Sequence, residues 1–110
     1  MTYILNYSVY LFIATQRFIE YPINQTVVYG NIVDFNCLSY GIPPPEVFWY
    51  FSSKNTSKTS SITGSDRHIL HQNGTLTIQS VSYFDEGTYI CGSSNAGLLR
   101  NASAFLEVYG

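Results

Sequence analysis

Apolar and polar residues alternate with a period of two in several short segments of this 110-residue chain. Such alternation is typical of β-strands that bury one face. From residue 16 onward, no segment of useful length has the helical period. The pattern therefore predicts seven or more short strands and an all-β two-sheet sandwich. The alternating positions are Val33, Phe35 and Cys37; Val47, Trp49 and Phe51; Leu76 and Ile78; Tyr89 and Cys91; and Ala104, Leu106 and Val108.

Turn-forming sequences separate the predicted strands. GIPPP at 41–45 and SSKNTSKTSSITGS at 52–65 are predicted to be loops. Asn73-Gly74 predicts a hairpin turn, because both residues tolerate a positive φ. Residues 1–15 are left unassigned, either as a signal-like stretch or as the product of a truncated gene model. Residues 16–110 are predicted to form one domain.

Composition excludes several classes of protein. The net charge is −2, only 11% of residues are charged, and no run of Lys or Arg occurs, which argues against nucleic-acid binding. The longest apolar run covers six residues, 9–14, whereas a membrane-spanning helix needs about 20. The aromatic content of 16% favours strands instead.

Motifs around the two cysteines resemble those of I-set immunoglobulin domains. The likeness covers about residues 17–109, and the stretches NQTVVYG, EVFWYF, NGTLTIQSV, GTYIC and AFLEV are most similar to roundabout axon-guidance receptors. One departure is Gly97, which comes one residue early after Asn95 and predicts a shortened turn. The matching positions are Gly30, Val33, Phe35 and Cys37; Gly41, Pro43, Pro45 and Trp49; Leu76 and Ile78; and Asp85, Gly87, Tyr89 and Cys91.

The resemblance implies an immunoglobulin-like Greek-key sandwich with a Cys37–Cys91 disulfide between its sheets. Trp49, Phe35 and Leu76 are expected in the core. The Tyr89 hydroxyl is expected to bond to the backbone of the preceding turn. Arg67 and Asp85 are expected to form a salt bridge, the alternative being two solvated charges worth under about 1 kcal/mol. Buried free cysteines are the alternative to the disulfide.

Asn-x-Ser/Thr sequons occur more often than the composition would give by chance. They place candidate glycosylation sites at Asn24, Asn55, Asn73 and Asn101, and a fifth sequon begins at Asn6. The alternative is a Ser/Thr/Asn-rich loop composition without glycans. Glycosylation would place the domain outside the cell, where disulfides persist.

Catalytic and metal-binding groups are sparse. His68 and His71 lie three residues apart and are predicted on opposite strand faces, and no third ligand is spaced to complete a zinc site. Asp85 and Glu86 are adjacent on a turn, where they do not form a general acid/base pair. The sequence predicts no enzyme and no cofactor.

Function is therefore expected on a surface. Alternation points Phe48, Tyr50, Ile90 and Phe105 outward on neighbouring strands, where they would form an apolar patch that docks a protein. The partner would be another immunoglobulin domain, a neighbouring domain or a receptor ligand. The alternative is that these side chains only stabilise the sheet. Alternation places Asn101 on the same outward strand face as Phe105, so a glycan there would crowd the patch.

The sequence as a whole predicts an extracellular module of a cell-surface receptor or adhesion protein. By the resemblance, its role is protein recognition in axon guidance or cell adhesion, and its parent protein is anchored in the plasma membrane or secreted. Two alternatives stay open. One is an intracellular structural domain of a giant muscle protein, and the other is an ectodomain module of a receptor tyrosine kinase.

Overall fold

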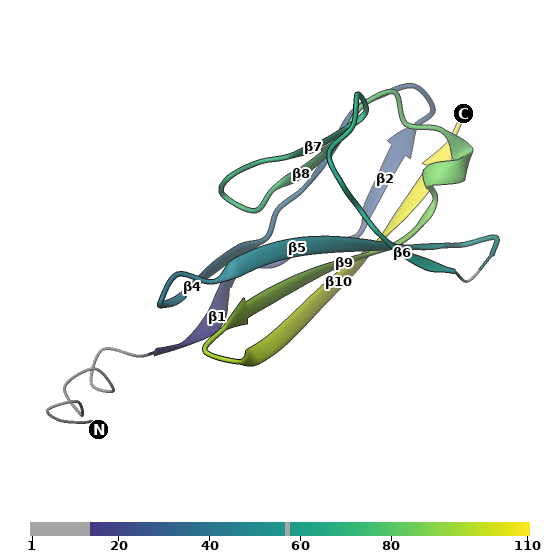
Figure 1. The fold of residues 1–110 in the computed structure, drawn as a ribbon. Coiled ribbons are helices and arrows are strands. Elements are labelled where there is room, and N and C mark those ends of the chain that lie inside the picture. The colour runs from purple at the N-terminus through teal and green to yellow at the C-terminus, as the bar shows by residue number, and fades with distance from the viewer. Residues whose placement is uncertain (1–13, 57) are drawn as a thin grey trace, which may run out of the picture.

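The computed structural model describes residues 14–56 and 58–110, which form a two-layer β-sandwich (Figure 1). The all-β sandwich predicted from the alternation is confirmed. A turn of 3-10 helix, η1 (Tyr83–Asp85), lies between β8 and β9 and was not expected. The strands are β1 (Ala14–Glu20), β2 (Gln25–Val28), β3 (Val33–Phe35), β4 (Leu38–Ile42), β5 (Glu46–Ser53), β6 (Thr59–Ser61), β7 (His68–Leu70), β8 (Leu76–Ile78), β9 (Gly87–Asn95) and β10 (Leu98–Tyr109).

The larger layer is a five-stranded sheet with the order β2-β10-β9-β5-β6. β10 runs antiparallel to β9 and parallel to β2. The second layer contains β3-β8-β7 and the pair β1-β4. Only residues 36 and 37 separate β3 from β4, so one extended segment pairs first with β8 and then with β1. Because the backbone stays extended through this change of partner, Val33, Phe35 and Cys37 alternate as they would in a single strand.

The core lies between the layers and is centred on the Cys37–Cys91 disulfide. Trp49 is directly opposite Cys91 across β5 and β9, is 2% exposed, and donates its indole N–H to the carbonyl of Gly74 at 2.9 Å. The rings of Phe35 and Tyr89 stack at 5.0 Å. Leu76 is fully buried beside them. The inward faces of the predicted strands thus form one apolar core.

Two expectations about local structure were wrong. The segment 52–65 is not entirely a loop, because β6 pairs with β5 at its edge. All three residues of β6 are exposed, so the strand has no apolar face from which alternation could have predicted it. The segment 41–45 is not entirely a loop either, because Gly41 and Ile42 belong to β4. β1 begins at Ala14, which is opposite Ile42 of β4. Residues 1–13 and the sequon at Asn6 lie outside the described residues.

The two short hairpins have the expected turn residues. Gly74, between β7 and β8, has φ +102°, and a Cβ there would meet the carbonyl oxygen of Cys37 at 2.0 Å. Ala96 and Gly97, with φ +51° and +81°, form a two-residue turn between β9 and β10. Positive φ at both positions is the signature of a tight type I′ hairpin. The shortened turn predicted from Gly97 is present.

Candidate functional site

The outer face of the β5–β9–β10 sheet is the surface predicted to bind a partner. Tyr50 lies opposite Ile90, and Ile90 lies opposite Ser103. Phe105 is two residues further along β10, opposite Thr88, and is therefore a diagonal neighbour of Ile90. The predicted side chains occupy one face. Only Phe105, at 37%, is exposed, while the other three are half-buried.

Phe48 is half-buried because it packs on its own sheet. It lies opposite Gly92, and a Cβ on Gly92 would meet Cε2 of the Phe48 ring at 2.5 Å. The Phe48 and Tyr50 rings meet edge to face with centroids 5.8 Å apart. Asn101 lies opposite Gly92 on the other side, so Phe48, Gly92 and Asn101 form one row across the sheet. Gly92 is the residue that sequence reasoning missed here.

A partly buried ion pair closes one end of the sandwich. Arg67 donates two hydrogen bonds to the Asp85 carboxylate, at 2.8 and 2.9 Å, and one to each of the carbonyls of Gln79 and Ser80. Asp85 is 5% exposed and also accepts from the backbone N–H of Ser82. Burial alone would raise the pKa of Asp85. The hydrogen bonds from Arg67 and Ser82 and the Arg67 charge outweigh burial and leave this pKa lowered.

Two other titratable groups, Tyr89 and His68, lie at the same end of the sandwich. The Tyr89 hydroxyl donates to the carbonyl of Asp85 at 2.6 Å, and burial followed by the Asp85 charge raises the pKa of Tyr89. Burial, and then the positive charge of Arg67, lowers the pKa of His68. Within the described ranges no three His, Cys, Asp or Glu side chains are grouped for a metal ion. These groups hold this end of the sandwich together.

A network of hydrogen bonds from buried polar side chains, at the opposite end of the sandwich, was not predicted from the sequence. The Gln16 side chain donates to the carbonyls of Ser93 and Leu98, both at 2.8 Å. The Asn95 amide donates to the carbonyls of Ala14 and Pro43 at 2.9 and 3.0 Å, and its oxygen accepts from the Gln16 backbone. Gln16 and Asn95 are 1% and 5% exposed. In the sequence, the only indication of this network was Asn95 itself, the asparagine that precedes the early Gly97.

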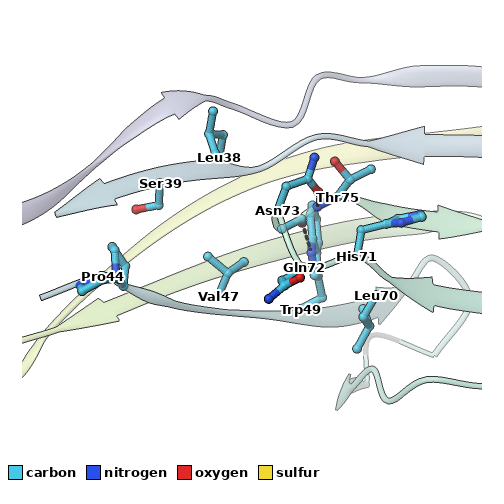
Figure 2. Close-up of a pocket in the computed structure, with 12 residues that line it drawn as sticks. Leu38, Ser39, Pro44, Val47, Trp49, Leu70, His71, Gln72, Asn73 and Thr75 are labelled. Carbon is cyan, nitrogen blue, oxygen red and sulfur yellow. Dashed lines mark hydrogen bonds between the residues drawn. The ribbon is translucent and has the colours of Figure 1, made fainter.

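A hollow of about 280 Å³ opens between the β7–β8 turn and the start of β5 (Figure 2). Its wall includes Pro44, Val47 and Leu70, and Trp49 lies on its inner side. His71 is the only titratable residue in this wall, and its Nε2 is 2.8 Å from the Thr77 hydroxyl. Asn73 lines the hollow as well. One histidine with a hydroxyl partner does not make a catalytic site.

The four sequon asparagines in the described residues are all exposed. Asn24 precedes β2 and its side-chain oxygen accepts from the backbone N–H of Phe105 at 2.9 Å. Asn55 lies in the β5–β6 turn, and Asn73 in the β7–β8 turn. Asn101 is on β10. Each amide is at a surface position where a glycan could be attached.

A family model described as immunoglobulin domain matches residues 17–95. The chain belongs to the immunoglobulin domain family. In the described part of this immunoglobulin domain, no helix has the length and apolar character needed to cross a membrane.

Relatives of this immunoglobulin domain are much longer proteins. It is 39% identical over 72 residues to human matrix-remodeling-associated protein 5, covering 64% of this chain and 2% of that protein. It is 36% identical over 87 residues to zebrafish (Danio rerio) vascular endothelial growth factor receptor kdr-like, covering 79% of this chain and 6% of that protein. The chain therefore spans only a few per cent of the length of these relatives.

This chain is similar to solved immunoglobulin domains of both intracellular and extracellular proteins. The complex of titin M10 with the obscurin-like 1 immunoglobulin domain, in its F17R mutant form, has a chain at TM-score 0.76 and 26% identity, with 88% of this chain and 95% of that chain covered. Extracellular domains 3–5 of Drosophila OTK give TM-score 0.75 and 27% identity, with 96% and 33% covered. The immunoglobulin fold is a general protein–protein recognition module, and it is generally not enzymatic.

Proposed function

We propose that this chain is an extracellular immunoglobulin module of a cell-surface receptor, adhesion protein or matrix protein, and that it acts by binding other proteins. The observation that supports this most is the combination of a buried disulfide with exposed sequons. Cys37 and Cys91 are joined, and all four sequon asparagines in the described residues are exposed. Disulfides persist outside the reducing cytosol, and sequons are modified there.

The finer assignment rests on the sequence motifs. The motifs Gly30-x-x-Val33-x-Phe35-x-Cys37 and Asp85-x-Gly87-x-Tyr89-x-Cys91 support the I-set class. The resemblance to roundabout receptors supports a role in axon guidance or cell adhesion, with the parent protein in or outside the plasma membrane. Similarity to a growth factor receptor supports the receptor class more generally. We assign no catalytic role to this domain.

Counting the reactive thiols of the chain tests whether the domain is extracellular. The native chain, isolated without reductant and then denatured, is expected to react with no equivalents of a maleimide reagent, and with two after reduction. The second candidate, an intracellular structural domain, is favoured by the similarity to titin and would give two reactive thiols without reduction. Two thiols in protein purified from its natural source would overturn the extracellular proposal.

We place the recognition surface on the β5–β9–β10 face, with Phe105 at its exposed edge and Phe48, Tyr50 and Ile90 beside it. Aromatic side chains are enriched at protein–protein interfaces. The partner would be a receptor ligand or another immunoglobulin domain. Saturable binding of the labelled chain to cells should be lost in Phe105→Glu and kept in Tyr21→Glu, which changes an exposed tyrosine after β1. Equal binding by both variants would contradict this surface.

A further inference from the structure

The hollow beside the β7–β8 turn has apolar walls and a sequon asparagine at its rim. Pro44 and Val47 form one wall, and Leu70 and Asn73 belong to the other (Figure 2). Pro44 and Leu70 are exposed, and Val47 is half-buried. The volume of about 280 Å³ is close to the lower limit of about 300 Å³ for small-molecule sites, which suits one ring-sized group.

The Asn73 side chain is held by its oxygen. The backbone N–H of Thr75 donates to Asn73 Oδ1 at 3.0 Å, and the Thr75 hydroxyl donates to Asn36 Oδ1 at 3.3 Å. Asn73-Gly74-Thr75 is one of the sequons. A glycan is attached to the side-chain nitrogen of a sequon asparagine. The hydrogen bond from Thr75 to the oxygen is therefore compatible with a sugar on the nitrogen.

The turn that carries Asn73 is fixed against the core. The Gly74 N–H donates to the carbonyl of His71 at 3.0 Å, and the Gly74 carbonyl accepts from the Trp49 indole at 2.9 Å. A Cβ on Gly74 would lie 3.5 Å from Cγ1 of Val47, so the turn is close to the opposite wall. A group that packs between walls already held in place costs little ordering of the protein.

We propose that the first N-acetylglucosamine of a glycan on Asn73 packs into this hollow and forms a structural part of the domain. This inference rests on the extracellular assignment proposed above. In the transfer, the Asn73 nitrogen loses a proton and bonds to C1 of the sugar, and the bond from C1 to the diphosphate of a lipid-linked oligosaccharide donor breaks. The C–H face of the sugar ring covers Val47 and Leu70, which removes apolar surface from water.

The covalent bond to Asn73 determines which ligand occupies the hollow. A group tethered by a short linker has an effective concentration of about millimolar or more beside its site, so weak packing is enough to hold it. Asn55 provides the contrast, because it lies in the β5–β6 turn between the exposed residues Lys54 and Thr56. A sugar on Asn55 faces solvent, so the two sugars should differ in their effect on stability.

The test compares one polypeptide with and without the sugar. A chain that keeps only the Asn73 sequon is secreted from a eukaryotic host and trimmed by an endoglycosidase to a single N-acetylglucosamine. The same sequence is made without glycan in an oxidising bacterial compartment. The sugar should raise the midpoint of thermal unfolding by about 4 °C. A matched chain that keeps only the Asn55 sequon should change by less than about 1 °C. All other sequon asparagines of each chain, from the set Asn6, Asn24, Asn55, Asn73 and Asn101, are replaced by Gln.

Two further measurements locate the sugar. NMR should show nuclear Overhauser contacts from the sugar on Asn73 to the methyl groups of Val47 and Leu70. Leu70→Ser, which removes one apolar wall, should at least halve the rise in midpoint. Ile69→Ser is the matched control, because Ile69 precedes Leu70 on β7, is 37% exposed and lies on the opposite strand face. It should leave the rise unchanged.

The possible failures are distinguishable. A sugar on Asn73 that gives no rise in midpoint, or that makes no contact with Val47 and Leu70, would overturn the packing and leave the extracellular assignment standing. A secreted chain whose mass shows Asn73 unmodified would overturn the packing as well. Two reactive thiols in the protein from its natural source would overturn the extracellular assignment, and this inference with it.

Discussion

Single residues secure this domain at its two ends, where buried polar side chains join segments that are distant in the sequence. At one end, the Asp85 carboxylate accepts hydrogen bonds from the Arg67 side chain and from the backbone N–H of Ser82. Asn95 joins the strands at the other, through Gln16 and the carbonyls of Ala14 and Pro43. In both cases a single side chain satisfies several buried groups, so its loss leaves more than one of them without a partner.

Asp85→Ala is expected to lower the free energy of unfolding by about 2 kcal/mol, because Arg67 and the Ser82 N–H lose their acceptor. This is less than the roughly 3–5 kcal/mol for breaking a fully buried pair, since the Arg67 side chain is 38% exposed. Urea unfolding at pH 7 measures it. Asp66→Ala, at the exposed neighbour of Arg67, is the control and should change stability by less than about 0.5 kcal/mol. Equal effects of the two variants would contradict the ion pair.

The Asp85 contribution also depends on pH. Its folded-state pKa is lowered below the ordinary value of 3.8, so the folded state binds its proton less readily than the unfolded state. The stabilisation is therefore fully present above that value and is lost as the pH falls through the folded-state pKa. The stability difference between the unmodified chain and Asp85→Ala should be constant from pH 7 to 5 and shrink below about pH 4. A difference that grows on acidification would contradict the assignment.

Asn95→Ala should cost about 2–3 kcal/mol, because it leaves the Gln16 N–H and two carbonyls without their partner. Asn31→Ala, at an exposed asparagine in the β2–β3 turn, provides the control. Hydrogen exchange would add a local readout, since the amide of Gln16 should lose protection. Unchanged protection at Gln16 would show that Asn95 does not hold β1.

At the scale of elements, β5 and β9 explain how the sheet face is shaped. Gly92 leaves room for the Phe48 ring, which therefore packs on the sheet instead of standing away from it. Most of the aromatic surface predicted from alternation is consequently half-buried. Alternation gives the direction of a side chain from its strand, but it does not show whether the ring then folds down onto a glycine of the next strand.

Gly92→Ala should destabilise the domain by about 1 kcal/mol, because its Cβ would overlap the Phe48 ring and displace it. In a Phe48→Ala background the same change should be neutral or stabilising, since the ring is gone and alanine restricts the unfolded chain. Thermal unfolding of the four proteins measures the coupling. Gly64→Ala, where the nearest atom is 4.0 Å away, is the matched control. Additive effects would mean that Phe48 does not rest on Gly92.

Elements with one buried face were predictable from the sequence, and elements without one were not. The core residues Trp49 of β5, Tyr89 and Cys91 of β9, and Ala104, Leu106 and Val108 of β10 stand at alternating positions of their strands. β6 is exposed on both faces and η1 is a single capped turn, so neither has a hydrophobic period. The division of 32–42 into β3 and β4 depends on which strand pairs with each half, and pairing is a tertiary property.

The same contrast applies to the functional surfaces of the whole molecule. The sheet face could be predicted because its residues share strand parity. The contact between the exposed rings of Tyr29 and Tyr83, whose centroids are 5.0 Å apart, could not be predicted, because one comes from a turn and the other from a 3-10 helix. Only the folded chain brings these two rings together.

The intact mass of the chain, secreted from a eukaryotic host and measured before and after glycosidase treatment, tests the extracellular assignment most directly. The exposed positions of Asn24, Asn55, Asn73 and Asn101 predict a mass above that of the polypeptide, and a loss of that excess after treatment. Replacing each of these asparagines by Gln in turn should remove one glycan at every modified site. A secreted, folded chain with the bare polypeptide mass at all four sites would contradict the account.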